Sequence, residues 1–196
     1  MCQVSPGGPD KGGNCKVESR KMNLILIGYR GTGKSTVGKI VAEMLNFKRI
    51  ETDAEITDRA GMSIPEIVKE NSWNYFRDLE SEVVSEACSM ENTVIDCGGG
   101  VVTRPENVKA LKRSGIIFLL KADINDILRR ISSSSQRPSL TGDKSFTVEV
   151  EQVLKEREPL YQAAADYIID TSSESPRTAG KKIAQIYRKL TDSGSS

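Results

Sequence analysis

The stretch GYRGTGKST, at residues 28–36, decides the fold expected for this chain. It fits the pattern G-x-x-x-x-G-K-[ST], in which glycines let backbone N–H groups curl around an oligophosphate without a clashing Cβ. A short apolar run, residues 23–27, precedes it, and apolar residues at helical spacing follow it to residue 45. Strand, glycine loop and helix form the context of a phosphate-binding loop, whereas the alternative is an ordinary glycine turn before a helix. The stretch predicts a site for a nucleoside triphosphate.

The residue types at the end of the loop suit this ligand. The helix that begins near Lys34 offers unsatisfied N–H groups and a favourable dipole to the phosphates. Lys34 would neutralise the β- and γ-phosphates, and the Ser35 hydroxyl would ligate Mg²⁺. The residues expected to contact ATP in this loop are Gly31, Thr32, Gly33, Lys34, Ser35 and Thr36.

Composition limits the remaining possibilities. The 196 residues favour one domain, and the net charge of +1 gives no reason to expect nucleic acid or a membrane surface as a partner. No apolar run approaches the roughly 20 residues that span a bilayer. The four cysteines lack metal-ligand spacing, so reduced thiols and a cytoplasmic location are expected. The chain has no histidine, so acid–base work must fall to Asp, Glu, Lys or water.

Strand and helix patterns alternate along the chain. Residues 1–21 lack periodicity and predict a disordered tail, residues 22–191 a single domain, and residues 192–196 a frayed end. The expected strands are residues 23–27, 48–52, 93–97, 116–120 and 167–170. The expected helices are residues 34–45, 54–60, 63–70, 72–90, 105–114 (closed by Gly115), 123–131, 146–163 and 177–190. This alternation predicts an α/β fold whose five-stranded parallel sheet is covered on both faces, with ligands beyond the carboxyl ends of the strands.

Several polar residues follow these strands in a recognisable order. Asp53 comes after the second strand, Arg77 lies in a helix, a glycine triplet at residues 98–100 follows the third strand, and Arg157 precedes Tyr161. Arg137 lies between the last two, in a serine-rich loop. From about residue 23 to 190 the chain resembles the shikimate kinases, P-loop kinases of the nucleoside-monophosphate-kinase type. The resemblance implies a three-layer α/β/α fold with a mobile lid at about residues 132–146, and a monomer that phosphorylates shikimate with ATP and Mg²⁺.

The resemblance also implies roles for individual residues. Arg77 and Arg157 would hold the carboxylate of shikimate by charge-assisted bonds, and Asp53 would orient the hydroxyl nucleophile and take its proton. The backbone of Gly99 would approach the ring closely. Arg137 would move with the lid to stabilise the transferring phosphoryl group. Arg130, at the end of its helix, would pack against adenine.

Each of these residues has a simpler explanation. Asp53 could cap the following helix. Arg77 and Arg157 could form surface ion pairs with Glu80 and Glu158. The glycine triplet could be a tight turn, and Arg137 a solvated loop residue. Their shared order and spacing favour the functional interpretation.

Two positions depart from the family pattern. Glu51 stands where the family usually has an aspartate that takes part in Mg²⁺ hydration, and Asp96 stands where the family commonly has a small or hydroxyl residue. The longer side chain of Glu51 could shift the metal geometry. Asp96 resembles a Walker-B carboxylate that holds a Mg²⁺-bound water. The hypothesis is that Asp96 partly compensates for Glu51.

Two rival functions remain at this stage. The first is a related small-molecule kinase, such as a gluconate or nucleoside-monophosphate kinase; the paired arginines and glycine triplet argue against it. The second is a catalytically silent module that binds a nucleotide or a partner. Such a module should have lost part of its lysine, aspartate and arginine set, and here that set is complete.

Overall fold

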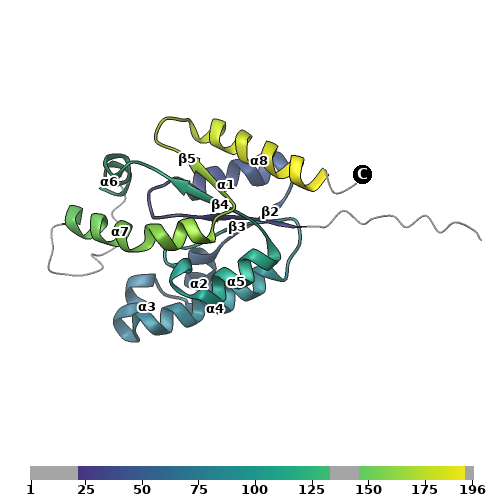
Figure 1. Ribbon diagram of the computed structural model, residues 1–196. Helices are drawn as coiled ribbons and strands as arrows, with labels where there is room; N and C mark the ends of the chain where they lie inside the picture. The colour runs from purple at the N-terminus through teal and green to yellow at the C-terminus, as the bar shows by residue number, and fades with distance from the viewer. Residues whose placement is uncertain (1–21, 133–145, 193–196) are drawn as a thin grey trace, which may run out of the picture.

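A parallel sheet forms the centre of the computed structural model, which describes residues 22–132 and 146–192 (Figure 1). Within these ranges the sheet has five strands in the order β2-β3-β1-β4-β5. The strands are β1 (Asn23–Ile27), β2 (Lys48–Glu51), β3 (Thr93–Asp96), β4 (Gly115–Lys121) and β5 (Tyr167–Asp170). Because all pairs are parallel, the carboxyl ends meet at one edge, and the glycine loop after β1 lies at its middle.

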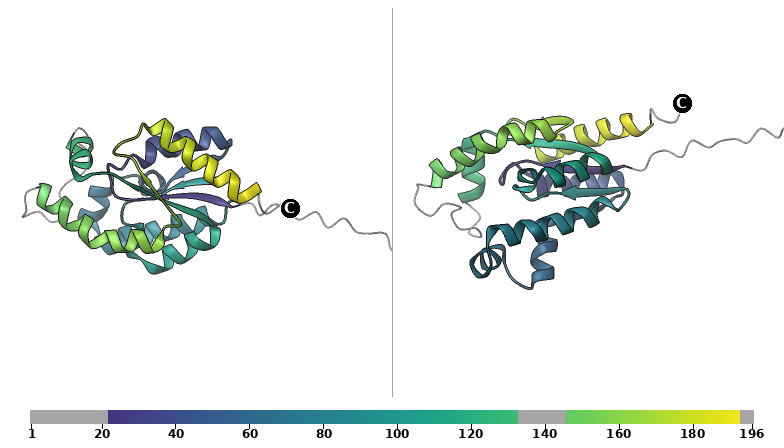
Figure 2. Two further views of the ribbon diagram at one scale, coloured as in Figure 1. Left: turned by 45° about the horizontal axis from the view of Figure 1, so that its top comes forward. Right: turned by 60° about the horizontal axis from the view of Figure 1, so that its bottom comes forward.

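Helices cover both faces of this sheet (Figure 2). On one face lie α1 (Lys34–Leu45) and α8 (Pro176–Asp192), which pack against each other. The other face is covered by α4 (Trp73–Cys88), α5 (Pro105–Ser114), α6 (Ile124–Ser132) and α7 (Phe146–Ala164). The shorter helices α2 (Thr52–Ala60) and α3 (Ile64–Glu70) pack on α4, below the sheet in Figure 1. The three-layer α/β/α arrangement predicted from the sequence is therefore confirmed.

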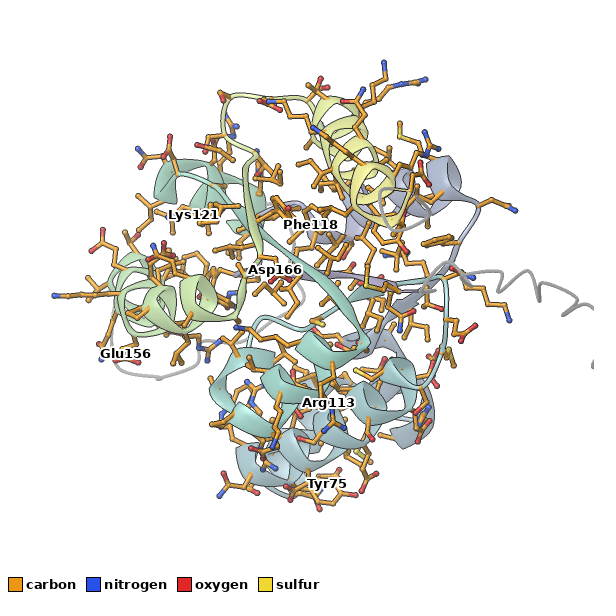
Figure 3. All side chains as sticks on the ribbon, turned by 45° about the vertical axis from the view of Figure 1, so that its right-hand side comes forward. Tyr75, Arg113, Phe118, Lys121, Glu156 and Asp166 are labelled. Atoms are coloured by element: carbon orange, nitrogen blue, oxygen red, sulfur yellow. The ribbon has the colours of Figure 1, made fainter. Side chains whose placement is uncertain are left out.

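The core follows from the alternation of side chains along the buried strands. Leu24 and Leu26 of β1 join the cluster under α1 and α8, whereas Ile25 and Ile27 join the cluster on the opposite face. Phe118 of β4, labelled in Figure 3, lies on the first side and stacks on Tyr167 with ring centroids 5.4 Å apart. A strand buried on both faces needs an uninterrupted apolar run, which is what β1 and β4 contain.

The helix ends follow local rules. Ser63 precedes α3, and its backbone N–H donates to Glu66 Oε2 at 2.7 Å, which completes a capping box. Ser72 caps α4 by accepting from the Tyr75 backbone N–H at 3.1 Å. Arg77 lies in the second turn of α4, four residues after the first residue of the helix.

Three local expectations need correction. The second strand ends at Glu51, because Thr52 and Asp53 already belong to the first turn of α2. Gly115 closes α5 as predicted and in addition starts β4, so this strand begins one residue earlier than expected; a Cβ there would lie 1.9 Å from Asn23 O, so close strand pairing requires the glycine. A 3₁₀ turn, η1 (Val101–Thr103), follows the glycine triplet and was not anticipated.

Some sequence predictions lie outside the described residues. These are the tail at residues 1–21, all but the first and last residues of the predicted lid, and residues 193–196. Over the ranges that the structure does describe, none of the helices is both long enough and apolar enough to cross a bilayer.

Candidate active site

The phosphate-binding loop connects β1 to α1 in a conformation that only glycine adopts easily. Gly28, Gly31 and Gly33 all have positive φ angles, of 139°, 80° and 89°. At Gly28 a Cβ would also lie 2.4 Å from the backbone oxygen of Leu120, so no larger residue fits there. Lys34 begins α1, is largely buried, and donates from Nζ to Tyr29 O at 3.1 Å. The loop thus presents the α1 N-terminus and a lysine to one point, as a phosphate site requires.

A cavity of about 490 Å³ opens at this point, at the carboxyl edge of the sheet. Its wall combines the glycine loop, the ends of β2 and β3, and α6. The lining residues are Arg30, Gly31, Gly33, Lys34, Ser35, Thr36, Glu51, Asp53, Asp96, Cys97, Gly98, Gly99 and Arg130. The predicted nucleotide and acceptor residues therefore meet around one space.

Arg130 links the glycine loop to the residue after β5 on the nucleotide side of the cavity. Its Nη1 donates to Gly31 O at 3.1 Å and its Nη2 to Thr171 O at 3.0 Å. The Thr171 hydroxyl, which is nearly buried, lies 2.8 Å from Thr32 O. Sequence reasoning did not identify Thr171, although it directly follows β5 at the edge where ligands are expected. The pair holds the loop in place, and the guanidinium lines the cavity where adenine is expected.

Oxygen ligands and one arginine gather at the ends of β2 and β3. Ser35 Oγ donates to Glu51 Oε1 at 3.0 Å, and Glu51 pairs with Asp96 in the strand register. Arg49 Nη1 lies 3.1 Å from Glu51 Oε2 and 3.2 Å from Asp96 Oδ2. The sequence identified Arg49 only as a strand residue. Its guanidinium offsets part of the negative charge of Asp96, the acidic residue at which this chain departs from the family pattern.

The carboxyl group of Asp96 is buried behind this cluster, with 2% of the residue exposed. Burial raises its pKa to about 6, and the neighbouring charge of Glu51 acts in the same direction. Lys34, the Ser35 hydroxyl and Arg49 each act to lower the same pKa. Asp96 thus depends on its cationic neighbours to carry a charge at this position.

The oxygen donors at this edge of the sheet have the chemistry that a magnesium ion requires. Mg²⁺ in kinases is held by one or two protein oxygens, with water and substrate phosphates supplying the remaining ligands. The Ser35 hydroxyl, hydrogen-bonded to a carboxylate at the cavity wall, is such a donor, and Glu51 and Asp96 add hard oxygens beside it. No group of three or more acidic, histidine or cysteine side chains able to hold a metal occurs in residues 22–132 and 146–192. The donor set suits an ion shared with phosphates.

The glycine triplet organises the acceptor side. Gly98 donates its backbone N–H to Thr52 Oγ1 at 2.8 Å, and a Cβ on Gly98 would lie 2.4 Å from Asp53 Oδ1. A Cβ on Gly100 would lie 2.0 Å from Arg77 Nη2. The sequence singled out Gly99 for close approach, yet within the protein itself Gly98 and Gly100 are the crowded positions. Gly99 instead offers its carbonyl to Arg157 and Tyr161.

Arg157 extends from α7 to this turn. Its Nη1 donates to Gly99 O at 3.0 Å, and the Tyr161 hydroxyl donates to the same oxygen. Burial raises the pKa of Tyr161 to about 12, so its hydroxyl keeps its proton for this bond. The alternative ion pair with Glu158 is not the one formed, because Glu158 pairs with Lys121 at the end of β4. Arg157 is thus held at the acceptor turn.

Arg77 does pair with Glu80, but not at the surface. Arg77 Nη1 donates to Glu80 Oε2 at 2.7 Å, and Glu80 has no exposed surface. The guanidinium lies over the Phe76 and Trp73 rings, 5.1 and 5.6 Å from their centroids. Burial raises the pKa of Glu80, while Arg77 and Arg157 lower it. Glu80 was not predicted as a site residue. The sequence does contain a signal for it, because Glu80 is a charged residue among the apolar residues that form the buried face of α4.

The structure brings most of the predicted site residues together. Lys34, Ser35, Asp53 and Gly99 line one cavity, and Arg77 and Arg157 reach its glycine wall from two helices. Arg137 lies outside the described residues, so its position stays a prediction.

Comparisons with known proteins agree with this arrangement. The sequence model of a family described as shikimate kinase matches residues 30–190. A shikimate kinase of Caldanaerobacter subterraneus subsp. tengcongensis is 42% identical over 168 residues, covering 86% of this chain and 97% of the relative. One from Thermodesulfovibrio yellowstonii is 39% identical over 170 residues, covering 87% and 97%.

Solved structures give the same result. A shikimate kinase from Acinetobacter baumannii in complex with shikimate has a TM-score of 0.82 at 32% identity, covering 88% of this chain and 96% of that one. A gluconokinase from Sinorhizobium meliloti reaches a TM-score of 0.52 at 15% identity, covering 88% of this chain and 97% of that one, which shows a shared fold alone. With the family model spanning most of its length and relatives near 40% identity, this chain belongs to the shikimate kinase family.

Proposed function

We propose that this enzyme transfers the γ-phosphoryl group of ATP to a hydroxyl of shikimate, giving ADP and shikimate 3-phosphate. Family membership supports the reaction class. The structural observation that carries the proposal is that Lys34, Asp53, Gly98 and Gly99 line one and the same cavity. A phosphate donor and a hydroxylated acceptor can both be held there within bonding distance.

The acceptor is held by charge and by close backbone approach. Arg77 and Arg157 bind its carboxylate, because a guanidinium offers paired N–H donors to a carboxylate. Asp53 accepts a hydrogen bond from the reacting hydroxyl. The hydroxyl oxygen attacks the γ-phosphorus, the bond from that phosphorus to the bridging oxygen breaks, and ADP leaves. The hydroxyl proton passes to Asp53 as the transfer proceeds.

The nucleotide side supplies positive charge. Lys34 and the N-terminus of α1 bind the β- and γ-phosphates, and Arg130 packs on the adenine side. Ser35 is the direct Mg²⁺ ligand in this proposal, with Glu51 and Asp96 acting through bound water. A Mg²⁺ ion held there would supply positive charge that offsets the charge developing during transfer. Arg137, outside the described residues, is proposed to add charge at the transferring phosphoryl group.

The assay that tests the proposal measures ADP release with ATP and shikimate. Turnover should depend on shikimate and not occur with gluconate or a nucleoside monophosphate in its place. Turnover of one of those compounds, but not of shikimate, would identify a different kinase. Tight ATP binding without ADP production in the presence of shikimate would indicate a catalytically silent module.

Arg77→Ala tests the acceptor assignment. The variant should raise the shikimate KM about 10- to 100-fold, the range of one charge-assisted contact, and change the ATP KM little. Steady-state kinetics with each substrate varied in turn measures both values. Equal effects on the two KM values would contradict a contact to one substrate only.

Asp96→Ala tests the metal assignment. If Asp96 holds a Mg²⁺-bound water, the variant needs more Mg²⁺ for half-maximal turnover, and direct titration with Mn²⁺ in the presence of ADP shows weaker binding. Asp96 also contacts Arg49, so Arg49→Met serves as the matched variant that breaks this ion pair and keeps the carboxylate. An unchanged metal dependence in Asp96→Ala would leave Asp96 with a structural role only.

A further inference from the structure

Arg30 is a further arginine at this cavity, and the proposed reaction gives it no role. It lies in the glycine loop, two residues after Gly28, and lines the cavity together with Lys34. Its guanidinium lies 5.7 Å from the centroid of the Tyr29 ring and 5.6 Å from that of Phe146, the first residue of α7. Two aromatic rings therefore hold it by cation–π contact, one from its own loop and one from another element.

The hydrogen-bonding groups of Arg30 distinguish it from the other arginines of the site. Its Nε and Nη2 atoms are buried, and neither has a hydrogen-bond partner among the described residues. Arg77 and Arg157, by comparison, each donate to an oxygen of the protein. A buried donor without a partner costs stability, and such groups in native proteins call for a physical explanation. Donors on a cation that have no protein partner suit an anion that arrives with the substrates.

The position of Arg30 indicates which anion this is. Its backbone nitrogen lies 3.5 Å from where a Cβ on Gly99 would be, so the residue begins where the phosphate loop meets the acceptor turn. The acceptor carboxylate is assigned to Arg77 and Arg157, and the adenine side to Arg130. The anion that passes from the phosphate loop to the acceptor turn during the reaction is the phosphoryl group itself.

We propose that Arg30 donates from Nε and Nη2 to oxygens of the phosphoryl group as it reaches the acceptor. The inference rests on the proposed function and adds a residue to it. A contact that is stronger to the transferred group than to the separate substrates accelerates transfer and tightens binding of the phosphorylated product. Arg30 thereby differs from Arg77 and Arg157, which bind shikimate before and after transfer.

The test compares the affinities of two ligands in one variant. Arg30→Met keeps an unbranched side chain against the two rings and removes the donors. Calorimetry should show about 10- to 100-fold weaker binding of shikimate 3-phosphate and a shikimate affinity changed by no more than about twofold. The kcat should fall by a similar factor, with both KM values nearly unchanged. Arg113→Met, which removes an exposed arginine from α5, is the matched control and should behave as wild type (Figure 3).

Other outcomes overturn the proposal. Equal weakening of both ligands would assign Arg30 to the acceptor itself, and unchanged binding of both would make it a packing residue. If Arg30→Met loses its cooperative thermal unfolding, Arg30→Gln, which retains polar character, is measured instead with the same expectations. Wild-type enzyme that fails to phosphorylate shikimate would remove the proposed function as well. Active wild-type enzyme together with an Arg30 variant that behaves like wild type would remove this inference alone.

Discussion

At the scale of single residues, the three glycines of the acceptor turn are not equivalent. A Cβ on Gly98 would lie 2.4 Å from Asp53 Oδ1 and 2.9 Å from Glu80 Oε1. On Gly99 its nearest neighbours would be at 3.5 Å or more, an ordinary contact distance. Gly98 is therefore required by the protein's own side chains, and Gly99 is free to meet a ligand.

Gly98→Ala and Gly99→Ala separate these two requirements. Gly98→Ala should displace Asp53 and lower kcat/KM for shikimate about 100-fold or more, with a loss of roughly 1–3 kcal/mol in unfolding free energy from overpacking. Gly99→Ala should unfold like wild type and raise the shikimate KM. Denaturant titration and steady-state kinetics on both variants measure this. Wild-type stability in Gly98→Ala would show that Asp53 can shift freely.

This division of roles illustrates the limit of prediction from sequence at this scale. The triplet could be identified as an acceptor turn, because it follows a buried strand and the family uses it there. Which of the three glycines is crowded could not be identified from the sequence. Asp53 and Arg77 come from α2 and α4, and their distances from the turn depend on packing. Arg49 and Thr171 were missed for the same reason, because Asp96, which Arg49 contacts, lies on another strand and Thr32, which Thr171 contacts, lies in another loop.

At the scale of one element, α4 carries both an apolar face and a charge on that face. Phe76, Val83 and Val84, which recur at helical spacing, are buried in the core. Glu80 lies on the same stripe, fully buried and paired with Arg77. The spacing of apolar residues identifies the buried face of a helix. It does not show whether a charged residue on that face has a partner, because this depends on the positions of side chains in the folded protein.

Glu80→Gln tests the electrostatic balance on α4. Burial holds the pKa of Glu80 above the ordinary glutamate value of about 4.3, so the folded state binds the proton more tightly than the unfolded chain. Protonated Glu80 therefore contributes stability that is fully present below the pKa of the unfolded chain. This contribution is lost as the pH rises through the pKa of Glu80 in the folded protein. Wild type should lose unfolding free energy relative to Glu80→Gln as the pH rises above the ordinary glutamate pKa of about 4.3.

Urea titrations at several pH values measure this difference. Glu82→Gln, an exposed glutamate on the same helix, is the matched control and should show no such trend. The opposite sign for Glu80→Gln, with wild type gaining stability as pH rises, would mean that the ion pair with Arg77 outweighs the cost of burial.

At the scale of the whole molecule, the strand order explains why two ligands share one cavity. β1 lies in the middle of the sheet, with β3 on one side and β4 on the other. The phosphate loop after β1 is therefore adjacent to the acceptor turn after β3. The alternation of elements predicted a parallel sheet, but not this order, because strand pairing joins segments about 70 to 90 residues apart in the chain.

A thermal shift experiment tests whether the nucleotide side and the acceptor side of the cavity bind their ligands independently. A non-hydrolysable ATP analogue or shikimate, each at about 100 times its dissociation constant, should stabilise the fold by about 2.7 kcal/mol and raise the Tm by roughly 5–10 °C. Arg157→Met removes one carboxylate contact, which lies on the acceptor side of the cavity only. At the ligand concentrations used for wild type, the variant should lose most of the shikimate shift and keep the nucleotide shift.

Lys155→Met, which removes an exposed cation from the same helix α7, should keep both shifts. The discriminating result is the nucleotide shift of Arg157→Met. Because Arg157 donates to Gly99 O, its loss could instead loosen the turn that borders both ligands. Equal loss of the two shifts would then show that Arg157 organises the whole cavity and does not act on the acceptor alone.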